Sequence, residues 1–252
     1  MNSGVGDAGV VAAASSGRFD RLDVLRGVAI VWMALFHLCF DLNHFGFFTP
    51  KQAFTADPFW TTQRTAIVSL FLFCAGMGQA IALEQGQSWP RFWRRWAQIA
   101  GCAVLVSIGS AWMFPRSWIS FGVLHGIAVM LIGVRWMAPL RAWLWPLGAL
   151  AIGLPLVWRD EAFNGPCLRW IGLVTRKPVT EDYVPVLPWL GVMLWGAAAG
   201  QWLQARRPGW LRGAIPGAAR GLALLGRWSL SFYMVHQPVL VGLVMAAAAL
   251  RR

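Results

Sequence analysis

The chain has 252 residues, of which 58% are hydrophobic and only 13% are charged, and its formal net charge is +12. A soluble globular protein has about 25% charged residues, so this chain lacks the polar surface that a water-soluble domain of its size needs. The composition excludes an ordinary soluble enzyme, a disordered protein and a secreted disulfide scaffold. It predicts an all-α, polytopic helix bundle embedded in a membrane.

The positive charge is spread along the chain in short clusters that alternate with long apolar runs. This distribution is typical of the loops of membrane proteins, and no groove-reading motif accompanies it, so we expect no nucleic acid partner. The 4 cysteines form no Cys-x-x-Cys pair, and most of them lie inside apolar runs. They are therefore expected to form neither a disulfide nor a metal site.

The N-terminal residues 1–17 are rich in Gly, Ala and Ser and lack the basic start of a signal peptide. We expect them to be a retained, disordered tail, and residues 18–252 to form one transmembrane domain. A membrane span needs about 20 mostly apolar residues, and about seven segments of the chain qualify. These segments are Val24–Phe47, Ile67–Leu83, Trp96–Phe114, Ile119–Trp136, Leu140–Trp158, Val184–Leu203 and Leu222–Leu250.

Basic residues are distributed unequally between the two alternating sets of loops. One set is rich in arginine, whereas the other holds fewer basic residues, which the acids of segment 159–183 partly offset. Because basic loops stay in the cytoplasm, the N-terminus is predicted to be cytoplasmic, and an odd number of spans places the C-terminus outside. The arginine-rich set comprises Arg18, Arg21, Arg26, Arg91, Arg94, Arg95, Arg135, Arg141, Arg206, Arg207, Arg212 and Arg220.

The first predicted span carries ionisable residues, which are costly in lipid and therefore indicate function. At 100° per residue all of them fall within about 40° of His37 around the helix axis. His37 and Asp41, at positions i and i+4, can share a hydrogen bond that fixes the imidazole tautomer, as a general base requires. A cluster at the membrane interface, with His44 in the following loop, is the alternative interpretation. The residues of this stripe are Asp23, Arg26, His37, Asp41 and His44.

Two further histidines lie within predicted spans. His125 is expected near the outer end of the fourth span, and His236 near the middle of the last span, where Ser229 and Tyr233 share its helical face. Pro238 cannot donate to the carbonyl four residues earlier, so we expect a kink and a freed carbonyl that a polar neighbour or a ligand satisfies. Both histidines can instead be structural, His125 through a neighbouring carbonyl and His236 within a packing motif.

The arginine clusters on the predicted cytoplasmic side have two interpretations. They can set the topology and contact anionic lipid headgroups. They can also hold a polyanionic donor such as coenzyme A, because arginine binds phosphate in a bidentate manner. The scarcity of acids argues against a cation channel. The residues expected to hold such a donor are Arg26, Arg94, Arg95, Arg227, Ser229 and Tyr233.

A series of short motifs runs along the chain in a fixed order. It begins with Arg21-Leu22-Asp23-Val24-Leu25-Arg26-Gly27, followed by Met33, His37, Asp41-Leu42 and Phe45-Gly46, then Leu70-Phe71-Leu72-Phe73-Cys74-Ala75-Gly76, Phe121-Gly122-Val123-Leu124-His125, Pro188-Trp189-Leu190-Gly191, Gly226-Arg227-Trp228-Ser229-Leu230, Tyr233 and His236-Gln237-Pro238. In order and spacing these motifs resemble bacterial relatives of heparan-α-glucosaminide N-acetyltransferase, over most of the chain from Arg18 to Leu240.

The resemblance implies an acyltransferase of the bacterial inner membrane that moves an acetyl group from cytoplasmic acetyl-CoA to a sugar amine or hydroxyl on the outer face. Its implied partners are acetyl-CoA, a sugar or glycan acceptor and membrane lipids, without a metal, and a homodimer is a further expectation. His37, assisted by Asp41, then acts as general base, with His44 as a further candidate. His125 or His236 donates to the developing oxyanion or relays the proton.

Two other classes of protein are compatible with the sequence. A small-molecule transporter or lipid-binding membrane protein shares the intramembrane polar stripe but needs no acyl donor. A haem-bearing electron carrier uses histidines in apolar helices as axial ligands and predicts a Soret band.

Overall fold

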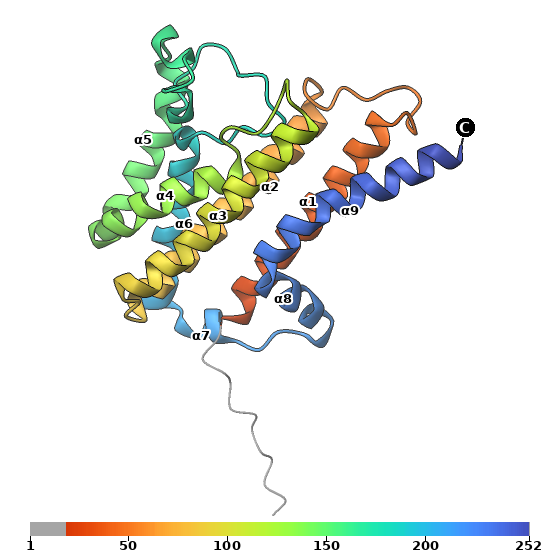
Figure 1. The fold of residues 1–252 in the computed structure, drawn as a ribbon. Helices are drawn as coiled ribbons and strands as arrows, with labels where there is room; N and C mark the ends of the chain where they lie inside the picture. The colour runs from red at the N-terminus through yellow and green to blue at the C-terminus, as the bar shows by residue number, and fades with distance from the viewer. Residues whose placement is uncertain (1–18, 252) are drawn as a thin grey trace, which may run out of the picture.

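The structure, a computed structural model, describes residues 19–251, and most of this stretch is helical (Figure 1). The predicted tail 1–17 lies outside the described residues. The described part contains no β-strand beyond one isolated bridge, so the all-α membrane bundle is confirmed. The α-helices are α1 (Asp20–His44), α2 (Pro58–Glu84), α3 (Trp89–Met113), α4 (Val123–Met137), α5 (Leu144–Val157), α6 (Val186–Arg206), α7 (Pro208–Arg212), α8 (Arg220–Arg227) and α9 (Ser229–Leu250).

Six helical stretches within residues 19–251 are long and apolar enough to cross a membrane. The sequence predicts about seven spans, and the difference lies in residues 123–157, which count as one stretch of 35 residues. Within that stretch α4 and α5 are separate helices of 15 and 14 residues, joined by the 3-10 helix Ala138–Trp143. Arg141 has a φ of 47° in this connection, and Figure 1 shows α5 returning toward the end where α4 began.

Two helices begin earlier than their apolar runs predict. α2 begins at Pro58 rather than Ile67, with Asp57 as an N-cap whose side chain accepts a backbone N–H. α3 begins at Trp89 rather than Trp96, again with a proline in its first turn. Proline is favoured at a helix start because the backbone N–H that it lacks would have no intrahelical partner at that position. The apolar run marks the part suited to lipid, whereas the cap marks the end of the helix.

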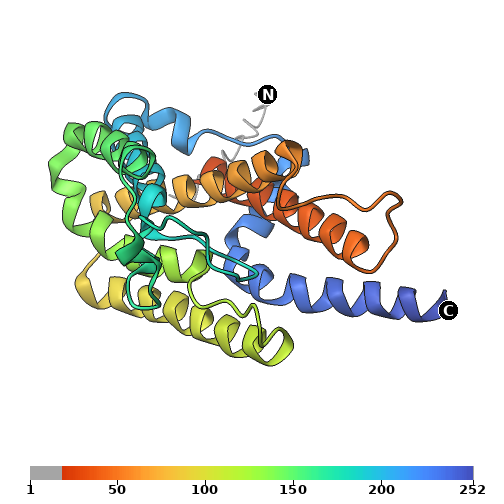
Figure 2. The same cartoon turned by 90° about the horizontal axis from the view of Figure 1, so that it is seen from above.

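The last predicted span, Leu222–Leu250, is divided in the structure. The chain turns at Trp228, with φ −96° and ψ 19°, so that α8 and α9 are separate helices. α8 lies beside the beginning of α1, and α9 runs alongside α1 in the same direction, as both views show (Figures 1 and 2). Pro238 lies inside α9, which continues to Leu250.

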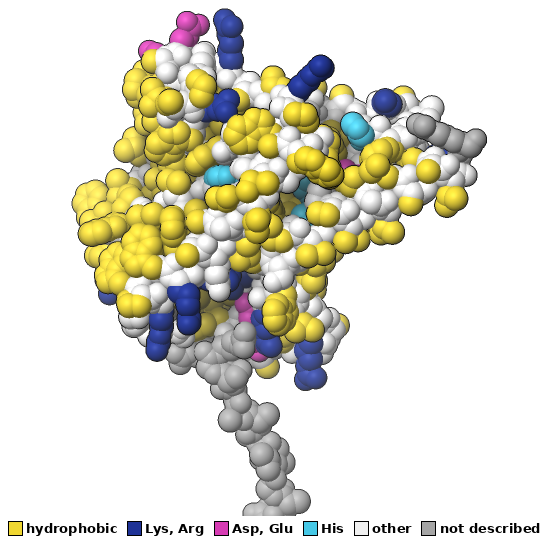
Figure 3. Space-filling view, viewed as in Figure 1, with side chains coloured by type: hydrophobic (Ala, Val, Ile, Leu, Met, Phe, Trp, Pro, Cys, Tyr) yellow, Lys and Arg dark blue, Asp and Glu magenta, His cyan; other side chains and the backbone are white. Residues whose placement is uncertain are grey.

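The bundle has two polar ends separated by an apolar belt. α7, α8 and the start of α1 lie at one end, and the connection 158–185 lies at the other (Figure 1). Hydrophobic side chains cover the middle of the face shown in Figure 3, while Lys and Arg gather toward the ends. We call the first end the α7–α8 face and the second the loop face. Within the described residues, the beginning of α3, the end of α6 and α8, which belong to the predicted arginine-rich set, lie toward the α7–α8 face (Figure 1).

Glycines bring several helices into backbone contact. A Cβ on Gly76 of α2 would overlap the backbone carbonyl of Met193 in α6. Gly27 of α1 lies in the same way against Leu222 of α8, and Gly226 lies against the first turn of α1. Helices in lipid associate through such close van der Waals packing of small residues, because lipid tails are as apolar as the side chains. The first turns of α1 are thereby held firmly against α8.

Candidate active site

A cavity of about 270 Å3 lies within the bundle between α1, α2, α3, α4 and the junction of α8 with α9. We call it the inner cavity. Arg94, one of the residues predicted to hold a donor, is exposed on α3 and does not line it. The other predicted donor-binding residues all line it: Arg26, Arg95, Arg227, Ser229 and Tyr233. Much of the remaining wall is apolar, from Phe71, Ile99, Leu124, Ile127, Leu131 and Leu230.

A second cavity, of about 250 Å3, lies nearer the α7–α8 face. It is lined by the first turns of α1, the last turns of α2 and the end of α8, and we call it the vestibule. Arg26, Gly78, Ala82 and Arg227 line both cavities. The two arginines therefore lie at the boundary between the vestibule and the inner cavity.

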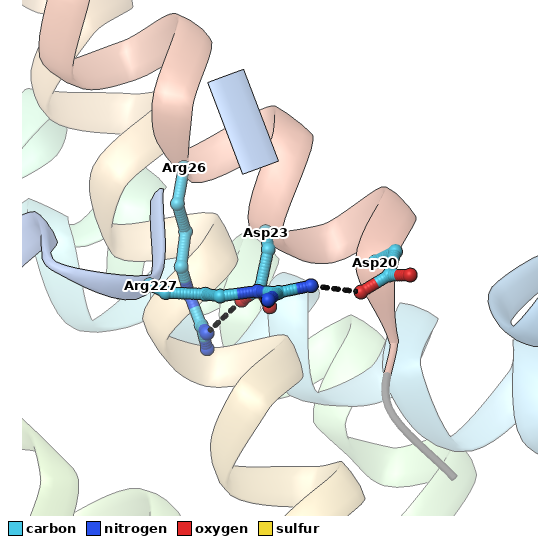
Figure 4. A network of polar contacts seen from close by, with 4 residues as sticks. All are labelled: Asp20, Asp23, Arg26 and Arg227. Atoms are coloured by element: carbon cyan, nitrogen blue, oxygen red, sulfur yellow. Dashed lines mark hydrogen bonds and ion pairs between the residues drawn. The ribbon is translucent and has the colours of Figure 1, made fainter. Parts of the chain in front are cut away.

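Four charged side chains form one network at this boundary (Figure 4). Arg26 Nη1 donates to Asp23 Oδ1 at 3.1 Å, and Arg227 Nε lies 3.5 Å from Asp23 Oδ2. Arg227 Nη2 donates to Asp20 Oδ1 at 2.7 Å. The side chain of Asp23 is 10% exposed, whereas those of Arg26, Arg227 and Asp20 are 30–32% exposed. The two carboxylates compensate the charges of the two guanidinium groups.

Local sequence features place this network. Asp20 and Asp23 lie in the first turn of α1, where the positive end of the helix dipole favours carboxylates. Arg26 follows Asp23 by three residues, the spacing at which side chains meet on a helix surface. Gly78 of α2 leaves the space that the Arg26 guanidinium occupies, since a Cβ there would overlap Nη2.

Further from the α7–α8 face, α1 and α9 bring two histidines together. The ring centroids of His37 and His236 are 5.3 Å apart, with an angle of 61° between the planes. Tyr233 connects this pair to the inner cavity, because it lines the cavity and its ring centroid is 5.7 Å from that of His236. Residues predicted on separate spans are therefore neighbours in the fold.

The two ring nitrogens of His236 differ in their surroundings. Nδ1 lies 2.8 Å from the backbone carbonyl oxygen of Tyr233. A carbonyl only accepts, so Nδ1 carries the proton and Nε2 presents a lone pair. Nε2 is buried and has no hydrogen-bond partner among residues 19–251. A tautomer fixed in this way leaves Nε2 ready to accept a proton.

Asp41 lies one helical turn beyond His37 and contacts α9 rather than His37. Gln237 Nε2 donates to both carboxylate oxygens of Asp41, at 3.1 and 3.2 Å. The expected hydrogen bond between His37 and Asp41 is not among the contacts of the described residues, and the donor that Asp41 meets is the amide of the neighbouring helix. Gln237 was not predicted as a site residue, although it stands in the His236-Gln237-Pro238 motif. His44, at the end of α1, stacks on Phe40.

His125 lies apart from this pair in a saturated hydrogen-bond network. Its Nδ1 accepts from the backbone N–H of Gly122 at 3.3 Å, so its Nε2–H donates to Ser107 Oγ at 3.0 Å. Ser107 in turn donates to the carbonyl of Ile119 at 2.7 Å. Within residues 19–251 no hydrogen bond or ring contact joins His125 to His37 or His236. His125 therefore caps the start of α4 and links it to the end of α3.

The loop face carries an acid that sequence reasoning did not single out. Asp182 Oδ2 accepts from the backbone N–H of Val123, the first residue of α4, at 2.7 Å. Burial raises the pKa of the Asp182 carboxyl, and the Val123 hydrogen bond and the charges of Arg64 and Lys177 oppose that rise. Burial also raises the pKa of Tyr183 to about 12. The one sequence signal for this region was that the acids of segment 159–183 partly offset its basic residues.

The fold and site define an integral membrane protein with basic side chains at one end of an internal cavity and a histidine pair beside its other end. Residues 18–238 match the family described as heparan-alpha-glucosaminide N-acetyltransferase, catalytic, and the chain belongs to this family of membrane acetyltransferases. The match confirms the resemblance drawn from the motifs. No curated protein and no solved structure matches the chain. Among the described residues no group of three His, Cys, Asp or Glu side chains is arranged to hold a metal ion.

Proposed function

We propose that the protein is an acetyltransferase of the bacterial inner membrane that uses acetyl-CoA from the α7–α8 face and acetylates a sugar amine or hydroxyl reaching it from the loop face. Family membership supports acetyl transfer over the transporter and electron-carrier readings. The arginine-rich loops support a cytoplasmic position for the α7–α8 face. The observation that carries the proposal is the buried Nε2 of His236, which has no hydrogen-bond partner in the described part of the chain, beside a cavity with arginines at its entrance.

The donor site in this proposal comprises the vestibule and the inner cavity. Arg26, Arg95 and Arg227 bind the phosphates of coenzyme A, for which planar guanidinium groups are suited. The uncharged arm that ends in the thioester extends along the apolar wall of the inner cavity toward Tyr233. Arg94 is not assigned to this site, because it does not line the inner cavity.

The reaction in this proposal is a direct acyl transfer. The acceptor nitrogen or oxygen attacks the thioester carbonyl, the new bond to the acyl carbon forms and the carbon–sulfur bond breaks. His236 Nε2 takes the proton that the acceptor loses and gives it to the departing sulfur, so that coenzyme A leaves as its thiol and His236 returns to its neutral form. General-base catalysis of this kind contributes roughly 10²–10⁴-fold to the rate.

His37 and Asp41 have supporting roles in this scheme. His37 is in edge contact with His236, and this contact holds the His236 ring in its orientation. Asp41 and Gln237 fix the relative position of α1 and α9 at this level. His44 lies nearer the loop face on the same side of α1, so it follows the histidine pair in the direction from which the acceptor arrives.

Transfer of the label from acetyl-labelled acetyl-CoA to glucosamine, by purified protein in liposomes, tests the proposal. Alanine variants of His37, Asp41, His44, His125 and His236 identify the residues involved. We expect loss of transfer with retained expression for His236→Ala and His37→Ala. Absence of both donor binding and transfer in the unmodified protein, or equal activity in all five variants, contradicts the proposal.

A further inference from the structure

Side chains of the charged network separate the vestibule from the inner cavity, and we call this boundary the passage. Arg26 and Arg227 line both cavities, and the Arg26 guanidinium fills the space above Gly78. A molecule that enters from the α7–α8 face therefore meets these two arginines before it reaches Tyr233. Figure 4 shows both side chains extended toward Asp20 and Asp23.

The two carboxylates differ in how readily a ligand can replace them. Asp23 is 10% exposed and contacts both arginines, so its removal leaves two cations with a lost partner in a largely buried place. Asp20 is 32% exposed, and among residues 19–251 its ion pair is with Arg227 alone. Exposed ion pairs contribute little free energy and exchange readily with competing ions. A phosphate offers Arg227 the same bidentate geometry as a carboxylate, with more charge.

We infer that Asp20 and Asp23 hold Arg26 and Arg227 across the passage as a gate, and that a phosphate group entering the vestibule opens it by replacing Asp20 on Arg227. Asp23 is the positioning residue, because it keeps both guanidinium groups at the passage while Asp20 is displaced. The identity of the phosphate compound as coenzyme A rests on the proposed function, whereas the gate itself does not.

Cysteine labelling from the α7–α8 face tests the gate without any enzymatic turnover. In a chain whose natural cysteines are replaced by alanine, Ala75→Cys places a thiol in the inner cavity and Gln85→Cys places one in the vestibule only. The probe is the membrane-impermeant reagent sulfonatoethyl methanethiosulfonate. With Asp20→Asn we expect labelling at position 75 to accelerate by up to about fivefold, the factor that an exposed ion pair contributes, and labelling at position 85 to stay unchanged.

Glu84→Gln is the matched control, since it removes one exposed negative charge from the same end of α2 without touching the network. It should leave labelling at position 75 unchanged, which separates gating from a general electrostatic attraction of the reagent. Equal labelling of position 75 with and without Asp20→Asn overturns the gate. Gel filtration of each variant in detergent confirms that only folded protein is compared.

Binding of adenosine 3′,5′-bisphosphate, measured by equilibrium dialysis, tests the exchange on Arg227. This probe carries phosphates but no thioester, so its binding is independent of acetyl transfer. We expect Asp20→Asn to bind it more tightly, by up to about fivefold, and Asp23→Asn to bind it more weakly, with Asp23→Glu restoring part of the loss. Unchanged or weaker binding by Asp20→Asn contradicts the exchange. Because labelling needs neither donor nor turnover, it decides the gate even where the acetyl-transfer assay fails.

Discussion

His236 carries the chemistry in this account because its two ring nitrogens have different partners. Nδ1–H donates to the carbonyl of Tyr233, and Nε2 has no partner within the described chain. His125, which is half-buried in the first turn of α4, has both nitrogens occupied by Gly122 and Ser107. The free nitrogen of His236 therefore distinguishes a proton acceptor from a structural histidine.

Replacement of His236 by glutamine tests this distinction. The amide retains a donor and an acceptor but cannot take up a proton, so we expect kcat for acetyl transfer to fall by about 10²–10⁴-fold. Donor KM should change little, because His236 does not line the inner cavity. His125→Gln is the comparison, with the main effect on thermal stability. A His236→Gln protein that keeps full kcat excludes His236 as the base.

Asp182 makes stability depend on pH in a direction opposite to that of a salt-bridged acid. Its pKa is raised above 3.8 by burial, so the folded protein retains a proton that the unfolded chain has lost. Stability should therefore fall as pH rises from about 4 through the raised pKa, and should level off above it. Asp182→Asn should remove this fall, because the amide oxygen still accepts from Val123 but does not titrate. Melting temperatures in detergent between pH 4 and 7 provide the measurement.

Glu161→Gln, an exposed acid of the same connection, is the control for that experiment. It should preserve the pH dependence of the unmodified protein. Parallel melting curves for the unmodified protein and Asp182→Asn across this range contradict the assignment.

At the scale of single residues, the sequence predicted the positions of the ionisable side chains on α1 better than it predicted their partners. The stripe on α1 was visible in the helical period, and Arg26 does line the inner cavity. The pairing of Asp41 with Gln237 was not predictable, because local spacing favours His37 as its partner and only tertiary structure brings α9 alongside. The contact of His37 with His236 was hidden for the same reason.

At the scale of helices, close packing depends on glycines that hydropathy does not detect. Gly76 lies in backbone contact with α6, whereas Gly101 of α3 has no atom within 4 Å of the position of a Cβ. Gly76→Ala should destabilise the protein by about 1–3 kcal/mol through overpacking. Gly101→Ala should be neutral or should stabilise it by up to about 1 kcal/mol through helix propensity. Unfolding by denaturant in mixed micelles measures both changes, and equal effects contradict the packing seen between α2 and α6.

The ends of helices were less predictable than their centres. Apolar runs located the middle of each span. α2 and α3 begin well before their apolar runs, because the proline in the first turn sets the start of each helix in polar surroundings. The division of Leu222–Leu250 at Trp228 was missed for a related reason. α8 has apolar residues on one side and arginines at both ends, so in a linear count its apolar residues merge with those of α9.

At the scale of the whole molecule, the distribution of arginine and the shared direction of α1 and α9 make the two ends of the bundle different. The charged network and vestibule lie toward the α7–α8 face, and the histidine pair lies farther along both helices. The composition predicted the membrane bundle, and the positive-inside rule predicted its orientation. The homodimer remains a prediction from the sequence. What composition could not provide is the inner cavity, which depends on how five segments of the chain pack around it.

The proposed transfer of an acetyl group from the α7–α8 face to the loop face is tested most directly by the sidedness of the reaction in liposomes that contain the protein in one orientation. Acetyl-labelled acetyl-CoA is supplied on one side only, and glucosamine is enclosed on the other. With the donor at the α7–α8 face we expect labelled acetylated sugar on the loop face. We expect no product when the two compounds are exchanged. Transfer that requires acetyl-CoA at the loop face, or no transfer from either side, would contradict the proposed transfer.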